Sequence, residues 1–184
     1  MDKIQNLIDL KSQSPTWFAV YTRHRHEKAA AEVLARKEVE AFLPLYAALH
    51  RWKDRTKELS VPLFPNYVFV LMGADQRGAV LSVPGVYDFV RLGGQPAPIP
   101  REEIEAIRQA VEGGRRVEPH PFLKSGDRVR VKAGPLEGVE GILVRKKNFY
   151  RLVLSVELLV RSISVEVAVT DVERVAEGRA FHAS

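Results

Sequence analysis

The sequence contains no cysteine, and it lacks several patterns on which common classes of protein depend. Without thiols there is no disulfide framework, thiolate metal site or cysteine nucleophile, which fits a reducing cytosol. No window approaches the roughly 20 apolar residues that a membrane-spanning helix needs. Residues 1–15 mix charged side chains among their apolar positions, so they contain no signal-peptide core. We therefore expect a cytoplasmic protein that does not contact a membrane.

Patterns for catalysis and metal binding are also missing. The glycines form neither the dinucleotide-binding fingerprint nor the phosphate-binding loop, so a nucleotide would have no cradle. The closest histidines, His24 and His26, have no carboxylate or cysteine partners at metal-ligand spacing. The acidic pair Glu102 and Glu103 opens a predicted helix, where the helix macrodipole explains it. We expect a protein that is not an enzyme and that uses no metal or cofactor.

What is present is an ordinary globular composition with a modest positive charge. Of the 184 residues 46% are hydrophobic and 28% are charged, and 28 Lys and Arg outnumber 23 Asp and Glu. A stretch rich in Gly, Pro and charge interrupts the periodicity and predicts a flexible linker between two domains. The expected parts are a disordered leader at 1–15, a first domain at 16–111, the linker at 112–123, a second domain at 124–176 and a disordered tail at 177–184.

The two domains differ in their secondary-structure pattern. The first has predicted strands at 17–22, 42–46, 61–72 and 86–92, and predicted helices at 27–37, 74–82 and after Pro100. This order of elements indicates an α+β domain of the split βαβ kind. The second domain consists of short Val-rich runs typical of a small closed β barrel. The Val and Ile at 163, 165, 167 and 169 would share one strand face.

A segment rich in proline and aromatic residues runs from Pro62 to Val70. Proline cannot lie in the paired interior of a central strand, so this segment enters the sheet late or follows its edge. The rings of Phe64, Tyr67 and Phe69 exceed what one small core needs, and they would form a docking surface for a partner helix. The alternative, in which these rings simply fill the core, stays open from composition alone.

Basic residues concentrate between Arg23 and Lys57, where there are nine Lys and Arg but five Asp and Glu. If the first helix lies beside the charged segment 51–57, several cations would form a patch for phosphates, with a Trp ring available to stack on a base. The residues of this predicted basic patch are Arg23, Arg25, Arg36, Arg51, Trp52, Lys53 and Arg55. The alternative is an ordinary solvated face with a charged hairpin tip.

These motifs together resemble the NusG/RfaH superfamily of bacterial transcription elongation factors. The runs that are similar to the NusG amino-terminal domain follow in the family's order, at 17–23, 42–44, 62–69, 83–86 and 96–99. The run at 126–131, followed by 134–138 and Gly141, resembles a KOW motif. The resemblance covers residues 16–176. It implies a NusG amino-terminal domain joined by the linker to an SH3-like KOW barrel.

The resemblance implies a factor that binds RNA polymerase rather than one that catalyses a reaction. Such a factor docks on the clamp helices of the largest polymerase subunit, closes the DNA channel and promotes processive elongation and antitermination. The docking residues would be Phe64, Pro65, Tyr67 and Phe69, and the basic patch would contact the non-template DNA strand. We expect a monomer. The runner-up is a KOW-containing RNA- or ribosome-binding module, because both kinds of fold also occur in ribosomal proteins.

Departures from the family pattern indicate a specialised paralogue that serves long operons. Asn66 stands where the housekeeping factor has Gly, and the segment that begins at Arg51 is similar to the specialised branch. In the KOW region, residues 158–161 replace the Ile-Phe-Gly-Arg pattern that contacts NusE or Rho, which argues against ribosome or Rho coupling through Leu159 and Arg161. Since residues 151–169 are rich in β-branched side chains, we predict a permanent β domain rather than the helical hairpin of some specialised members.

Overall fold

The structure, a computed structural model, describes residues 14–51, 56–123, 126–146 and 148–175. The contacts divide the chain into two compact units, residues 1–105 (unit 1) and 106–184 (unit 2), and the division falls inside helix α4. The predicted domain limits, 16–111 and 124–176, stay predictions. Residues 1–13 of the predicted leader and the predicted tail at 177–184 lie outside the described residues. Of the helices in the described part of the chain, none combines the length and the hydropathy that crossing a membrane requires.

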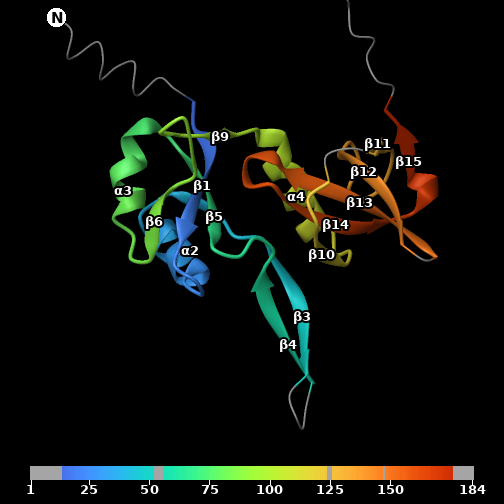
Figure 1. Cartoon of the computed structure of the whole chain (residues 1–184), viewed down its shortest axis with the longest axis horizontal. Helices are drawn as coiled ribbons and strands as arrows, with labels where there is room; N and C mark the ends of the chain where they lie inside the picture. The colour runs from blue at the N-terminus through green and yellow to red at the C-terminus, as the bar shows by residue number, and fades with distance from the viewer. Residues whose placement is uncertain (1–13, 52–55, 124–125, 147, 176–184) are drawn as a thin grey trace, which may run out of the picture. The chain divides into compact units, whose positions relative to one another are not determined.

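Unit 1 mixes strands with short helices, in the order that the sequence predicts (Figure 1). Its elements, ending with the helix that crosses into unit 2, are β1 (Thr16–Thr22), α2 (Glu27–Arg36), β2 (Glu40–Phe42), β3 (Leu45–Arg51), β4 (Thr56–Pro62), β5 (Tyr67–Met72), the 3₁₀ turn η1 (Ala74–Gln76), α3 (Arg77–Leu81), β6 (Val86–Phe89), β7 (Arg91–Leu92), β8 (Gln95–Pro96), β9 (Pro98–Ile99) and α4 (Arg101–Glu112). The predicted strands at 42–46, 61–72 and 86–92 are each divided in two, into β2 and β3, β4 and β5, and β6 and β7, whereas β8 and β9 are additions to the predicted set.

The main sheet of unit 1 has the strand order β2-β5-β1-β6, and β9 also pairs with β1. All of these pairs are antiparallel. The prediction that the proline segment enters the sheet late is confirmed, because Pro65 precedes β5 and the strand begins only at Tyr67. Strands β3 and β4 form a separate two-stranded hairpin that extends away from the main sheet (Figure 1).

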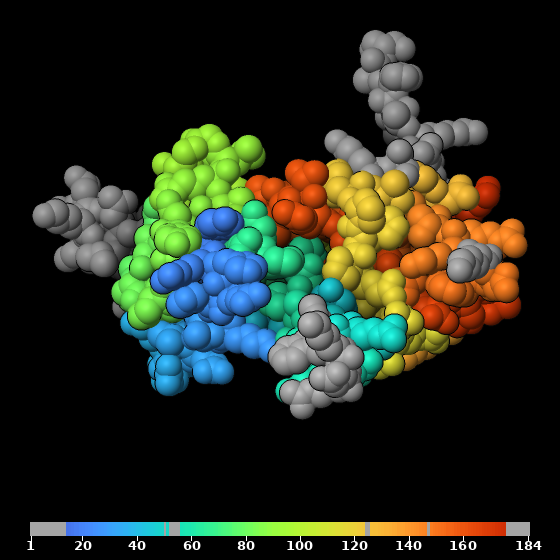
Figure 2. All heavy atoms as spheres, turned by 60° about the horizontal axis from the view of Figure 1, so that its bottom comes forward, coloured from blue at the N-terminus to red at the C-terminus, as the bar shows by residue number. Residues whose placement is uncertain are grey.

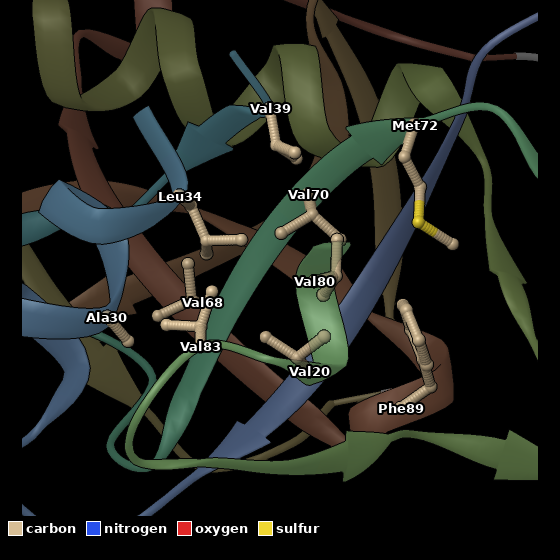
Figure 3. Close-up of a cluster of buried hydrophobic side chains, with 10 residues drawn as sticks. All are labelled: Val20, Ala30, Leu34, Val39, Val68, Val70, Met72, Val80, Val83 and Phe89. Carbon is tan, nitrogen blue, oxygen red and sulfur yellow. The ribbon is translucent and has the colours of Figure 1, made fainter. Parts of the chain in front are cut away.

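The core of unit 1 lies between the main sheet and the helices α2 and α3 (Figure 3). Val20 of β1 and Val68 of β5 are opposite each other in the register, so their side chains lie on the same face of the sheet. Leu34 of α2 and Val80 of α3 pack on these strand residues, and all four side chains are fully buried. Helices α2 and α3 therefore cover one face of the sheet, and neither of them covers the other face.

Unit 2 is built mainly from antiparallel strands (Figure 1). They are β10 (Val117–His120), β11 (Asp127–Val131), β12 (Glu140–Lys146), β13 (Phe149–Val156), β14 (Arg161–Val167) and β15 (Val172–Arg174), with 3₁₀ turns η2 (Glu157–Leu159) and η3 (Val169–Asp171). The strand order is β10-β14-β13-β12-β11-β15. Within the predicted β region 151–169, residues 151–156 and 161–167 form strands, and residues 157–159 and Val169 lie in the turns η2 and η3. Closure into an SH3-like barrel and the permanence of this β state stay predictions.

Two expectations for unit 2 need correction. The predicted linker at 112–123 is not wholly irregular, because residues 117–120 pair with β14 as an edge strand, a position that tolerates Pro119. Ile163, Val165 and Val167 share the buried face as predicted, but Val169 lies in the turn η3 and is 49% exposed. The strand period ends at Val167, so the two-residue alternation no longer applies to Val169.

Candidate protein-docking face

Three tyrosine side chains lie next to one another on the neighbouring strands β5, β1 and β6. Tyr21 is opposite Tyr67 in the β1–β5 register, and the two rings meet edge to face with centroids 5.6 Å apart. Tyr87 stacks on the ring of Tyr21, with centroids 6.0 Å apart and planes 28° apart. Tyr21 is 43% exposed, Tyr87 is 62% exposed, and Tyr67 is half-buried. We call these three residues the tyrosine ladder. Exposed rings of this kind provide apolar area and a hydroxyl group for contact with a protein partner.

The register of the sheet explains why two of these rings meet. Side chains alternate along a strand, so Trp17, Ala19 and Tyr21 share one face of β1. Phe69 is opposite Ala19 and Tyr67 is opposite Tyr21, which places them on the same face. This is the face that α2 and α3 leave uncovered. Along it, Trp17 and Phe69 are buried at one end, and the tyrosine ladder is accessible at the other.

The structure corrects the predicted docking residues. Phe64 is 1% exposed and Phe69 is 0% exposed, so the expectation of an exposed ring at these two positions is wrong. Phe69 stacks on Phe42 with centroids 6.2 Å apart, and Phe64 meets Phe69 edge to face at 5.4 Å. The rings bury one another, as the core alternative proposed. Of the predicted set, Pro65 is exposed and Tyr67 is half-buried, and these two residues stay available to a partner.

A tight turn places Tyr67 at the start of β5. The backbone N–H of Tyr67 donates to the carbonyl of Phe64 at 3.1 Å, which closes a four-residue turn. Pro65 fixes its own φ near −65°, and Asn66 has a φ of +70°. These two angles define a type II turn, whose third residue must adopt a positive φ. Asn tolerates this conformation better than most residues, so it can occupy a position that would otherwise favour Gly.

Hydrogen bonds connect the segments that carry the three tyrosines. The backbone N–H of Thr22 donates to the carbonyl of Asn66, and that of Arg23 donates to the carbonyl of Gly85, both at 2.8 Å. The N–H of Asn66 donates to Oε1 of Glu27, also at 2.8 Å. The segment after Tyr21 is therefore held by backbone hydrogen bonds to the turn before Tyr67 and to Gly85, two residues before Tyr87. These hydrogen bonds fix the positions of the three tyrosines relative to one another.

A surface ion pair lies at the β6 side of the tyrosine ladder. Asp88 is opposite Tyr21 in the β1–β6 register, and Nη2 of Arg91 donates to its carboxylate at 2.8 Å. The hydrogen bond from Arg91, followed by one from the backbone N–H of Phe89, holds the pKa of Asp88 below its usual value. Both groups are exposed to water, so the pair contributes little to stability. It nevertheless gives the ladder a charged rim.

The residues of the predicted basic patch fall on the loop before α2, on α2 and on the hairpin β3–β4. Arg23, Arg25, Arg36 and Arg51 are all exposed, whereas Trp52, Lys53 and Arg55 lie outside the described residues. Nζ of Lys28 in α2 donates to the carbonyl of Ser60 in β4 at 2.8 Å. This bond joins α2 to the hairpin beside Ala47, which is opposite Ser60, whereas Arg51 lies at the other end of β3, so a single patch that includes Arg51 stays a prediction. Figure 2 shows the spheres of the hairpin, in cyan to teal, next to the blue spheres of the first part of the chain.

The positive charge is distributed unequally between the two units. Residues 1–105 contain 14 Lys and Arg against 13 Asp and Glu, whereas residues 106–184 contain 14 against 10. The local surplus at 23–57 is thus almost cancelled within unit 1, and most of the net charge of +5 lies in unit 2. Charge alone therefore does not favour unit 1 as the part that binds nucleic acid.

The predicted partner loop of the KOW region follows β13. Leu159 is 8% exposed, so its side chain is part of the core rather than of an accessible surface. Val160 is 61% exposed and has a φ of +50°, the left-handed conformation that a Gly adopts without strain. Arg161 is exposed at the start of β14. Of the two residues expected to meet a partner, only Arg161 is accessible.

Among the described residues, no group of three or more His, Asp or Glu side chains is placed to hold a metal ion.

Comparison with known proteins identifies the family. The family model described as "Transcription termination factor nusG" matches residues 15–108, about half of the chain. The chain belongs to the NusG family. The NusG protein of Halalkalibacterium halodurans is 28% identical to it over 180 residues, which covers 86% of this chain and 98% of that protein. The NusG protein of Borreliella burgdorferi is 25% identical over 190 residues, with 88% and 100% covered.

One solved structure agrees with this assignment. A structure titled "Domain interaction in Thermotoga maritima NusG" matches with a TM-score of 0.53 and 26% identity, and the match covers 88% of this chain and 98% of that one. The resemblance to NusG drawn from the sequence motifs is thus confirmed, whereas the KOW assignment of the second domain stays a prediction. The curated relatives are transcription termination and antitermination proteins, which places this chain in a family of transcription factors.

Two residues of the tyrosine ladder, Tyr21 and Tyr87, are absent from the set predicted from sequence. A signal for Tyr21 exists, because alternation along β1 places it opposite to the buried Val20. Tyr87 has no comparable signal, since β6 is four residues long and a register irregularity follows Tyr21 in its pairing with β1. Its contact with Tyr21 depends on which strand lies beside β1.

Proposed function

We propose that this protein is a transcription elongation and antitermination factor that docks on RNA polymerase through the tyrosine ladder and Pro65. The docking partner is the pair of clamp helices on the largest polymerase subunit, and binding there closes the DNA channel and promotes processive elongation. The observation that carries the proposal is the row of accessible rings on the face that α2 and α3 leave uncovered. Membership of the NusG family supports the choice of polymerase as the partner.

The spacing of the rings fits a helical partner. The centroids of neighbouring rings are 5.6 Å and 6.0 Å apart, which is close to the 5.4 Å pitch of an α-helix. A helix that lies along the tyrosine ladder would place residues i, i+4 and i+7 against successive rings. Tyrosine is also common among the residues that dominate binding energy at interfaces.

Polymerase binding by single alanine variants tests this proposal. Because a well-packed tyrosine often contributes about 2 kcal/mol or more to an interface, we expect Tyr67→Ala, which removes the half-buried ring next to the Pro65 turn, to weaken the polymerase complex about 30-fold. Smaller losses are expected for Tyr21→Ala and Tyr87→Ala, whose rings are more exposed. The measurement is an affinity titration of the full chain against core polymerase, accompanied by pause lifetimes on a long template.

The matched control is Leu92→Ala, which removes a side chain that is 75% exposed and lies outside the tyrosine ladder. Phe69→Ala serves a different purpose, because it should lower the stability of unit 1 by about 3–5 kcal/mol and so report on unfolding. If Tyr67→Ala bound polymerase as tightly as the wild type does, the docking proposal would be wrong.

We further propose that the basic patch contacts the non-template DNA strand beside the docking site. Arg23, Arg25, Arg36 and Arg51 are exposed, and the contact between Lys28 and Ser60 holds α2 next to the hairpin. Phosphate contacts of this kind are independent of sequence, so they increase affinity without selecting a site. Service of particular long operons by a specialised paralogue is part of the same proposal. Selection of particular operons would need contacts to DNA bases as well.

The runner-up is a KOW-containing RNA- or ribosome-binding module. The observation in its favour is that unit 2 carries most of the net positive charge. Coupling to NusE or Rho through the loop at Leu159 and Arg161 has less support, since Leu159 is buried. The two candidates differ in which unit loses nucleic-acid affinity when its exposed cations are removed.

A further inference from the structure

Glu27 is a buried carboxylate at the first residue of α2. It is 4% exposed, although glutamate is almost never fully buried without a partner. Taking a carboxylate out of water is unfavourable unless hydrogen bonds replace the lost hydration. Its Oε1 accepts the backbone N–H of Asn66 at 2.8 Å, across 39 residues of sequence. The side chain therefore connects the helix to the turn that leads into β5.

The contact reaches the turn at its most constrained residue. Asn66 has a φ of +70°, and its carbonyl accepts the N–H of Thr22 at 2.8 Å. Its side-chain Oδ1 also lies 3.3 Å from Nδ1 of His24. With its N–H, carbonyl and side chain all held, Asn66 fixes the direction in which the chain enters β5. The next residue along the chain is Tyr67.

We infer that Glu27 is a positioning residue for polymerase docking: by accepting the Asn66 N–H, it fixes the turn that sets Tyr67 against Tyr21. The inference rests on the proposed docking function. Glu27 itself is buried and does not touch the partner. Its effect is carried by the hydrogen bond rather than by its charge, so an uncharged acceptor of the same length can replace it.

Four variants of the full chain separate these effects. Glu27→Gln keeps an acceptor oxygen at the same distance, Glu27→Asp keeps the charge but shortens the side chain by one methylene, and Glu27→Ala removes both. Glu32→Ala, at an exposed glutamate of the same helix, is the matched control. For each variant we would measure the affinity for core polymerase and the hydrogen-exchange rate of the Asn66 amide.

We expect Glu27→Asp and Glu27→Ala to weaken polymerase binding about tenfold and to speed exchange at the Asn66 amide, because one buried hydrogen bond is lost. Glu27→Gln should stay within about twofold of the wild type in both measurements. Glu32→Ala should change neither. If Glu27→Ala does not fold, the comparison of Glu27→Asp with Glu27→Gln still shows whether the hydrogen bond or the charge matters.

Three results would overturn the inference. Normal polymerase binding by Glu27→Asp, together with weakened binding by Glu27→Gln, would show that charge matters instead of the hydrogen bond. If Glu27→Asp and Glu27→Ala bind polymerase normally while Tyr67→Ala binds it weakly, the role of Glu27 is refuted and the docking proposal stays intact. Normal binding by Tyr67→Ala would refute the docking proposal, and the role of Glu27 with it.

Discussion

At the scale of single residues, backbone conformation separates two substitutions that look alike in the sequence. The resemblance to the family implies Gly at the positions of Asn66 and Val160, and both residues have a positive φ, +70° and +50°. Asn adopts this conformation at little cost, because its short polar side chain can bond locally. A β-branched residue there is a true outlier, since its branched Cβ crowds the backbone. Val160 therefore stores strain that Asn66 does not.

Replacing Val160 with Gly should stabilise unit 2. Release of the left-handed strain is worth about 1–2 kcal/mol, and the added chain entropy of Gly removes about 0.5–1 kcal/mol of it. We expect a net gain of about 1 kcal/mol in the free energy of unfolding. Urea unfolding, followed by hydrogen exchange of the β13 amides, would measure it.

Val169→Gly is the control for this prediction, because Val169 is also exposed and lies in a turn of the same unit. That variant should be neutral or slightly destabilising, since it gains chain entropy without a strain to release. A loss of stability in Val160→Gly would mean that the valine side chain makes contacts that outweigh the strain.

At the scale of elements, one charged cluster fastens the edge strand β10 to the rest of unit 2. Nη1 of the buried Arg151 in β13 donates to Glu118 of β10 at 2.6 Å and to Oγ of Ser164 in β14 at 2.8 Å. Arg116 and Lys146 also approach Glu118, at 2.8 Å and 3.5 Å. A single carboxylate thus joins three cations. Its removal would leave the buried Arg151 hydrogen-bonded to Ser164 but without a counter-charge.

Glu118→Gln should lower the stability of unit 2 by about 2–3 kcal/mol. Breaking a buried ion pair by removing one partner typically costs about 3–5 kcal/mol, and the value here is smaller because water still reaches Glu118. Urea unfolding at neutral pH would measure the change. Glu137→Gln, at an exposed glutamate in the 134–138 turn, is the control and should change nothing.

Glu118→Gln should also change how the stability of unit 2 depends on pH in acid. Burial alone would raise the pKa of Glu118, but the three neighbouring cations outweigh burial and hold the pKa below its ordinary value of 4.5. A carboxylate with a lowered pKa stabilises the fold above its unfolded pKa, and this contribution is lost as the pH falls through the folded pKa. The wild type should therefore lose stability below about pH 4.5 more steeply than Glu118→Gln does. An equal dependence of stability on pH in the wild type and in Glu118→Gln would contradict the assignment of this effect to Glu118.

At the scale of the whole molecule, the unit that carries most of the net positive charge is not the unit that carries the proposed docking face. The tyrosine ladder lies in unit 1, whose charges nearly cancel, whereas unit 2 has four more basic than acidic residues. If the protein holds the non-template strand as proposed, local placement of arginines in unit 1 must matter more than net charge. The salt dependence of binding can distinguish these possibilities, because its slope reports the number of phosphate contacts.

Paired substitutions in the two units give the test. Each phosphate contact with single-stranded DNA contributes about 0.7 to the slope of log affinity against log salt, so Arg23→Ala with Arg36→Ala should reduce the slope by about 1.4. Fluorescence anisotropy with a labelled oligonucleotide measures it. Lys132→Ala with Arg161→Ala, at exposed cations of unit 2, should leave the slope unchanged. The opposite result would favour the RNA-binding module.

The sequence by itself determined the family, the order of the main elements and the β character of unit 2. These features depend on local patterns: alternation at Ile163 and Val165 requires a strand, and Pro65 can only precede β5, because each of these effects acts within a few residues. Only the tertiary structure decided which rings are accessible. Phe69 and Tyr67 are two residues apart on one strand face, yet Phe42 and Phe64 cover the first and leave the second open, since burial depends on neighbours brought from elsewhere in the chain.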